Sequence, residues 1–144
     1  MVASKATSAH AFTSVFVDFE AVDRVRREHG ARWRADEGFA LTYLPFIARA
    51  VVDAVREVPI MNASVGERSV VLHRSVHLGI AVDLELEGLL VPVVRDAEVK
   101  RLRGIARDVY DLAARARNRS LSPDDLVGGT LTITNPGPFG TLVS

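Results

Sequence analysis

The sequence contains no cysteine and has no excess of charge of either sign. Without cysteine the chain has no disulfide framework, no thiol nucleophile and no zinc site that relies on thiolates. Its formal net charge is +0 at pH 7, so the excess positive charge that attracts proteins to nucleic acids or anionic membranes is missing. We therefore expect neither nucleic acid nor membrane as a partner.

Long apolar runs are also missing. The longest, such as residues 89–94, are far shorter than a membrane span, and residues 1–12 contain no apolar segment of signal-peptide length. These features predict a soluble, cytoplasmic protein. Hydrophobic residues nevertheless make up 48% of the 144 residues, which is enough for one folded domain with a core.

Hydrophobic periodicity predicts a mixture of helices and strands. Strands are expected where apolar residues alternate or run together, over residues 13–19, 69–73, 76–86, 89–94 and 130–134. Helices are expected where apolar residues recur every three or four positions, over residues 20–34, 41–58 and 101–119, with a short one starting at Ser122. The order β-α-α-β-β-β-α-α-β predicts an α/β sandwich with helices on at least one face of its sheet.

Three local features refine these elements. Residues 76–82 are apolar at nearly every position, which predicts a strand covered on both faces, and Pro92 predicts an edge or a bulge beside it. Thr42 could cap the second helix, and Pro59 should end it. Gly30 is a weak point inside or at the end of the first helix.

The four histidines are the residues best suited to acid–base chemistry. His29 lies among charges on a helix, and His73 and His77 are four residues apart in β structure, too far apart to share a metal. Structural or solvated roles are favoured for these three, and we expect no metal site. His10, which precedes the first expected strand, is a candidate for lining a site, although a surface role is the simpler interpretation.

Common nucleotide and hydrolase motifs are not found. The glycines at 128–129 and 135–140 are not followed by Gly-Lys-Ser/Thr, and no G-x-G-x-x-G or G-x-S-x-G occurs. The residues alone therefore predict an α/β domain with an exposed Thr134-Asn135 loop at the end of a strand.

Several segments, in a fixed order, resemble one known family. Residues 78–82 read LGIAV, and residues 88–97 read GLLVPVVRDA. Upstream lies PIMNAS at 59–64; downstream lie LSPDDL at 121–126 and GGTLTITNPGPFG at 128–140. This series is similar to the catalytic domain of the dihydrolipoyllysine acyltransferases, the core subunits of 2-oxo acid dehydrogenase complexes, and the resemblance covers essentially the whole chain.

The resemblance implies a fold, a reaction and partners. The fold would be the two-layer α/β sandwich of chloramphenicol acetyltransferase type, with residues 1–144 forming a partial catalytic domain, incomplete at the C-terminus. Such domains form trimers that build a larger core. They transfer an acyl group between coenzyme A and a dihydrolipoyl group carried on a separate lipoyl domain. Other partners would be the decarboxylating dehydrogenase component and dihydrolipoyl dehydrogenase.

The resemblance also implies the site residues. Thr134 matches the hydroxyl that donates to the oxyanion of the tetrahedral intermediate; otherwise it is a strand-end threonine capping its own turn. Candidate coenzyme A contacts are the loop residues Asn135, Gly137, Phe139 and Gly140.

The family's general base is a histidine in an H-x-x-x-D-G motif, and no histidine here has aspartate four residues later. We expect this base to come from sequence beyond residue 144. Two alternatives remain open. The chain could be an inert core-assembly or regulatory subunit, or a drug or metabolite acetyltransferase sharing the fold.

Overall fold

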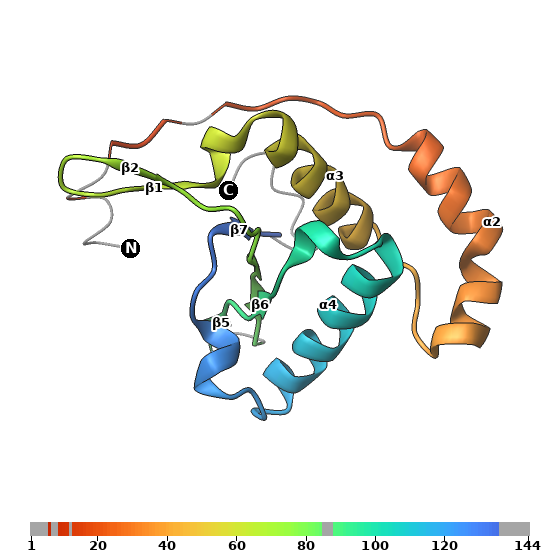
Figure 1. The fold of residues 1–144 in the computed structure, drawn as a ribbon. Helices are drawn as coiled ribbons and strands as arrows, with labels where there is room; N and C mark the ends of the chain where they lie inside the picture. The colour runs from red at the N-terminus through yellow and green to blue at the C-terminus, as the bar shows by residue number, and fades with distance from the viewer. Residues whose placement is uncertain (1–5, 7–8, 12, 85–87, 136–144) are drawn as a thin grey trace.

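The computed structural model describes residues 6, 9–11, 13–84 and 88–135. The helices in this part are α2 (Glu20–Glu37), α3 (Leu44–Glu57) and α4 (Leu102–Arg117), with short 3-10 helices η1 (Pro59–Asn62), η2 (Ala97–Val99) and η3 (Pro123–Leu126) (Figure 1). The strands are β1 (Ala63–Val65), β2 (Val70–Leu72), β3 (Leu78–Ile80), β4 (Val82–Asp83), β5 (Leu89–Leu90), β6 (Val93–Val94) and β7 (Leu131–Ile133).

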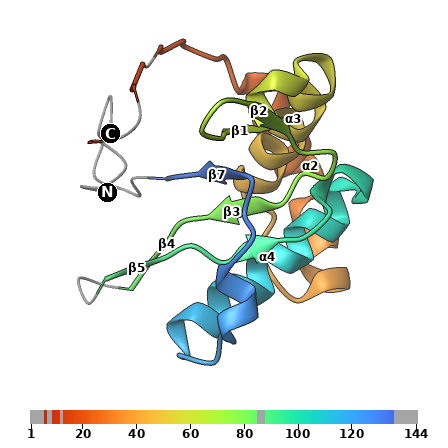
Figure 2. The same cartoon turned by 60° about the vertical axis from the view of Figure 1, so that its left-hand side comes forward.

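The central sheet has three strands in the order β6-β3-β7. Strand β3 is antiparallel to β6 and parallel to β7. All three of its residues are buried, which confirms the prediction of a strand covered on both faces. Two further pairs, β1–β2 and β4–β5, form antiparallel ribbons outside this sheet (Figure 2).

The main core lies between the central sheet and the pair α3–α4. Figure 1 shows these helices between the strands and the outlying α2. The buried residues of this core come from α3, the sheet and its flanks, and α4: Ala48, Val52, Val55, Val76, Leu78, Ile80, Val94, Ala97, Ile105 and Leu112. A second cluster, formed by Trp33, Leu41 and Ala106, holds α2 against α4. The predicted layering of helices on a sheet is confirmed.

The helix ends follow from local chemistry. Helix α2 runs through Gly30 and ends at Gly38, whose φ of 81° is favourable for glycine and whose N–H donates to the carbonyl of Arg34. The predicted cap at Thr42 is wrong, because Tyr43 occupies the N-cap position of α3 without a side-chain cap. The prediction that α3 stops before Pro59 is confirmed, since the helix ends at Glu57.

The predicted first strand, residues 13–19, is wrong. These residues are not assigned to any strand or helix, and Val15, Phe16 and Val17 are 81%, 92% and 65% exposed. The alternating pattern needs a neighbouring strand to become β structure, and the described part of the chain supplies none.

Other strands are shorter or more numerous than predicted. The segment 76–86 contains β3 and β4, and the segment 89–94 contains β5 and β6, which flank Pro92. Proline has no N–H to donate, although its carbonyl accepts from the N–H of Ile80 at 2.9 Å. Strand β6 lies at the edge of its sheet, as Pro92 predicted. Strand β1 was missed because Ala-Ser-Val is too short to show a period.

The predicted short helix after residue 121 is η3, and its start is fixed by a capping box. Asp125 Oδ2 accepts from the N–H of Ser122 at 2.7 Å and from its hydroxyl at 2.8 Å, and it pairs with Arg115 of α4. Hydrogen bonds from Ser122, followed by the pairing with Arg115, lower the pKa of Asp125. This junction connects α4 to the segment that leads into β7.

Gly79 in the centre of β3 is required by close packing. A Cβ added there would lie 2.9 Å from Cγ1 of Val91 and 3.0 Å from Oγ1 of Thr132. Gly79→Ala should therefore lower the free energy of unfolding by about 1–3 kcal/mol in chemical denaturation. Gly30→Ala is the matched control. With nothing within 4 Å of its added Cβ, it should raise stability by about 0.5–1 kcal/mol. Equal effects at both positions would contradict this account of Gly79.

Asp125 should make the stability of the chain depend on pH. Its pKa is lowered in the folded chain, so its contribution is complete above the ordinary value of 3.8 and is lost as the pH falls through the folded-state value. Asp125→Asn should lower the thermal midpoint at pH 7, with a difference from the parent chain that shrinks in acid. The control is Asp124→Asn, an exposed neighbour, which should leave the profile unchanged. A constant difference between Asp125→Asn and the parent chain from pH 7 to pH 3 would exclude this role.

Candidate active site

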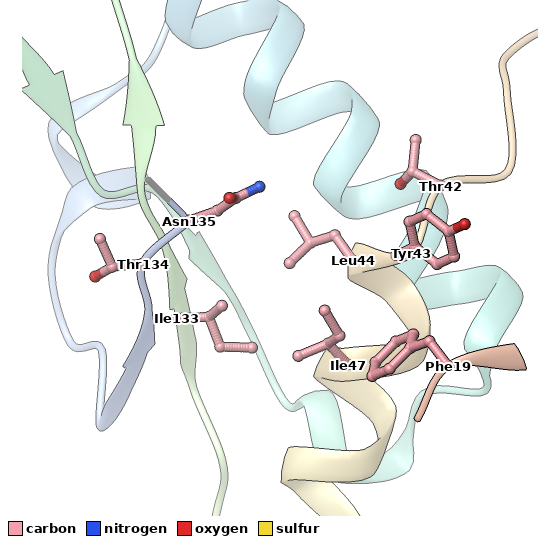
Figure 3. Close-up of a pocket in the computed structure, with 8 residues that line it drawn as sticks. All are labelled: Phe19, Thr42, Tyr43, Leu44, Ile47, Ile133, Thr134 and Asn135. Atoms are coloured by element: carbon pink, nitrogen blue, oxygen red, sulfur yellow. The ribbon is translucent and has the colours of Figure 1, made fainter. Parts of the chain in front are cut away.

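Thr134 is the first residue after β7, and the register of that strand determines its direction. Strand β7 pairs with β3 so that Ile133 lies opposite Ile80, and the carbonyl of Ile133 accepts from Ala81 N at 3.0 Å. Leu131 and Ile133 pack against the core, whereas Thr132 and Thr134 are exposed. Figure 3 shows Ile133 and Asn135 pointing toward α3 and Thr134 pointing to the opposite side of the strand.

The hydroxyl of Thr134 makes no hydrogen bond with any residue in the described ranges. The side chain is not packed in hydrocarbon, because it stands on the face of the sheet that α3 and α4 leave open. A neutral hydroxyl in this position can donate its proton to an oxygen that develops negative charge.

A cavity of about 690 Å³ lies beside Thr134, between the end of β7 and the start of α3. Its lining is mainly apolar and consists of Phe19, Thr42, Tyr43, Leu44, Ile47, Ile133, Thr134 and Asn135. Because the Thr134 side chain points away from α3, the cavity lies next to the hydroxyl and does not enclose it. Sequence reasoning missed this cavity, although the apolar spacing of the predicted helix 41–58 placed Leu44 and Ile47 on one helix face.

One wall of the cavity is fixed by an ion-pair cluster. The hydroxyl of Tyr43 donates to Asp23, which also pairs with Arg26 at 3.0 Å, and the Arg26 guanidinium lies 4.4 Å from the Tyr43 ring centroid. The hydrogen bond from Tyr43, followed by that from Arg26, lowers the pKa of Asp23. Phe19 meets Tyr43 edge-to-face at 5.9 Å. These contacts join the start of α2 to the start of α3.

The histidines lie elsewhere in the described structure. His10 and His29 are exposed, and neither lines this cavity. His73 Nε2 lies 2.8 Å from the Ser64 hydroxyl, and His77 Nδ1 accepts from the N–H of Asp96 at 3.1 Å. Both therefore have structural contacts.

Only one of the remaining loop candidates lies in the part of the chain that the structure describes. Asn135 lines the cavity, whereas Gly137, Phe139 and Gly140 lie outside the described residues.

Within the described residues, no group of three or more His, Asp or Glu side chains gathers to hold a metal ion. Nor does any helix there combine the length and apolarity needed to cross a membrane.

The fold and the sequence place this chain in a known class of protein. Residues 1–144 match the family described as the 2-oxoacid dehydrogenases acyltransferase catalytic domain. The chain therefore belongs to the catalytic-domain family of the 2-oxo acid dehydrogenase acyltransferases, and the expected family is confirmed.

The curated relatives come from complexes with different substrates. The chain is 46% identical over 128 residues to the dihydrolipoyllysine-residue acetyltransferase component of the pyruvate dehydrogenase complex of Mycobacterium tuberculosis, covering 88% of this chain and 23% of that protein. It is 35% identical to the lipoamide acyltransferase component of the branched-chain α-keto acid dehydrogenase complex of Bacillus subtilis, covering 100% of this chain and 34% of that protein. The chain thus spans about a quarter to a third of these relatives.

Solved structures show the same fold. The probable dihydrolipoamide acetyltransferase of Listeria monocytogenes superposes with a TM-score of 0.94 at 35% identity, covering 99% of this chain and 61% of that one. The cubic core of the pyruvate dehydrogenase multienzyme complex gives 0.81 at 31% identity, covering 87% and 51%. The chain therefore has the chloramphenicol acetyltransferase-like fold of these catalytic cores.

Proposed function

We propose that this chain provides the oxyanion-binding part of a site that transfers an acyl group between dihydrolipoyl-lysine and coenzyme A. The observation that carries the proposal is the exposed Thr134 hydroxyl at the end of β7, which makes no hydrogen bond within the described residues. Membership of the acyltransferase family over the whole chain supports it.

In the proposed acyl transfer, the Thr134 hydroxyl stabilises the tetrahedral intermediate. When the thiolate of one partner attacks the thioester carbonyl carbon of the other, a carbon–sulfur bond forms and the carbonyl electron pair moves onto oxygen. Thr134 donates a hydrogen bond to that oxygen. Collapse of the intermediate restores the carbonyl and expels the second sulfur, which takes up the proton removed from the first. Removal of one such donor typically lowers the rate about 100- to 1,000-fold.

The general base is proposed to lie outside these 144 residues, because no histidine in the sequence has aspartate four positions later. The dihydrolipoamide acetyltransferase of Azotobacter vinelandii, 32% identical with a TM-score of 0.80, is described with a serine, a histidine and an asparagine that have roles in its catalytic mechanism. A hydroxyl residue acting together with a histidine fits the roles proposed here, in which Thr134 donates to the oxyanion and a histidine outside these residues is the general base.

The partners are proposed from the resemblance to the acyltransferase family. We propose that the chain self-associates into a trimer and a larger core, and that it meets a lipoyl domain, a decarboxylating dehydrogenase component and dihydrolipoyl dehydrogenase. The cubic core among the structural neighbours supports self-assembly. Asn135, Gly137, Phe139 and Gly140 remain the proposed coenzyme A contacts, His10 remains a candidate, and the cytoplasm remains the predicted compartment.

A second function, core assembly or regulation without turnover, is favoured by a single observation: the H-x-x-x-D-G motif is missing from the sequence. An acyl-transfer assay distinguishes the two functions. It is carried out on the chain joined to a downstream sequence that carries the motif. Coenzyme A-dependent transfer from an acyl-dihydrolipoamide supports the enzyme. A folded, extended protein that transfers no acetyl, succinyl or branched-chain acyl group would leave only the assembly function.

Thr134→Ala in that extended protein should lower kcat about 100- to 1,000-fold with a small change in KM, because the lost hydrogen bond is made mainly in the transition state. Thr134→Ser should restore most of the rate. The control is Thr132→Ala on the same face of β7, which should remain close to the parent enzyme. Equal losses at positions 132 and 134 would point to a structural effect and contradict the oxyanion role.

A further inference from the structure

The direction of the Thr134 side chain depends on the register of the strand before it. Strand β7 pairs in parallel with β3 through three residue pairs, and Figure 2 shows it lying along β3. Side chains alternate between the two faces of a strand, so a shift of β7 by one residue would exchange its faces. Thr134 would then point toward α3, where Asn135 points in Figure 3. The position of the Thr134 hydroxyl therefore requires contacts that fix this register.

Thr130, four residues before Thr134, bonds to both backbone polar groups of His77. The N–H of His77 donates to Thr130 Oγ1 at 3.1 Å, and the Thr130 hydroxyl donates to the His77 carbonyl at 3.4 Å. The N–H of Thr130 donates to the same carbonyl at 2.8 Å. A hydroxyl can accept one hydrogen bond and donate another, which an apolar side chain of the same shape cannot do. Side chain and backbone of Thr130 together thus select His77 as the partner.

His77 is itself held from the other side of the sheet. Its Nδ1 accepts from the N–H of Asp96, which follows β6, at 3.1 Å. At the preceding residue, the carbonyl of Val76 accepts from Ala97 N at 2.8 Å, and Val76 N donates to Glu98 Oε2 at 2.9 Å. A shift of His77 along the sheet would break these three bonds. His77 therefore provides a fixed point from which Thr130 sets the register of β7.

At the other end of the pairing, the register reaches the candidate active site. Ala81 N donates to the carbonyl of Ile133, the residue before Thr134, at 3.0 Å. Thr132 lies between the two ends on the same strand, but its hydroxyl makes no hydrogen bond with the described residues. The double contact of Thr130 is therefore not shared by every threonine of this segment.

We propose that Thr130 is a positioning residue for acyl transfer: its hydroxyl, bonded to both backbone groups of His77, fixes β7 in the register that turns the Thr134 hydroxyl away from α3. The inference rests on the proposed oxyanion role of Thr134 and adds a residue that acts through it. Four residues of extended strand span roughly 13 Å, so Thr130 is too distant to contact the same oxygen.

The kinetic test uses the chain joined to a downstream sequence that carries the H-x-x-x-D-G motif. Thr130→Val preserves the shape of the side chain and removes its hydroxyl. It should lower kcat about tenfold and leave KM within about twofold, because a misplaced Thr134 weakens stabilisation of the transition state and not substrate binding. Thr130→Ser keeps the hydroxyl and should remain within about threefold of the parent kcat. Thr132→Val is the matched control and should behave as the parent protein does.

A double-mutant cycle distinguishes positioning from a purely structural effect. In a protein that already carries Thr134→Ala, Thr130→Val should change kcat less than about twofold, because no hydroxyl remains to be positioned. The full loss in that background would overturn the proposal, since Thr130 would then act independently of Thr134.

Hydrogen exchange resolved to single residues reads the register without an activity assay. The N–H of Ala81 should exchange about tenfold faster in Thr130→Val than in the parent protein, because its bond to Ile133 depends on the register. It should be unchanged in Thr132→Val. Protection of Ala81 that is equal in Thr130→Val and the parent protein would overturn the proposal.

Comparison with Thr134→Ala separates the positioning role from the proposed function. If Thr134→Ala lowers kcat and Thr130→Val does not, the positioning role is wrong and the oxyanion function stands. A loss in Thr130→Ser as large as that in Thr130→Val would also exclude the positioning role, because the hydroxyl would not be the group that matters. If Thr134→Ala leaves kcat unchanged, both the oxyanion function and the positioning role are wrong.

Discussion

Burial of β3 on both faces is the constraint on which the other elements depend. Its three residues, Leu78, Gly79 and Ile80, are covered by helices on one side and by Val91 and Thr132 on the other. The close approach at Gly79 allows β7 to lie parallel to β3 in the observed register. That register in turn determines which side of the sheet receives the side chain of Thr134.

Polar contacts then connect the outer elements to this centre. The Asp125–Arg115 pair joins η3 to α4, and the Tyr43–Asp23–Arg26 cluster joins α2 to α3. Exposed ion pairs of this kind contribute little to stability on their own. Their main effect is to specify orientation: each joins an element that carries few core residues to one that carries many.

The helices and the buried strand could be predicted from sequence because their patterns report packing within the chain. The spacing that predicted α3 included Val55, which is buried, and Leu44 and Val51, which pack partly buried against the core; the fully buried Ala48 and Val52 each lie one position after an apolar residue of that pattern. The continuous apolar run at 76–82 corresponds to β3. The strand predicted at residues 13–19 is wrong because alternating apolar residues favour a strand only where a partner strand is available. The pattern itself does not show where such a partner lies. The Thr134-Asn135 position at a strand end was predictable, but the cavity was not, since Phe19 and Asn135 are brought together only by the fold.

The parallel pairing of β3 and β7 also bears on the order of folding. Thr130 and His77, which hydrogen-bond at the start of this pairing, are 53 residues apart in sequence. Closing so long a loop costs conformational entropy that only the finished strand contacts offset, so pairings of this type form slowly. The hairpin β1–β2 and helix α4 can form from local contacts first. The strand that presents Thr134 is thus expected to dock late, when the surface that receives it already exists.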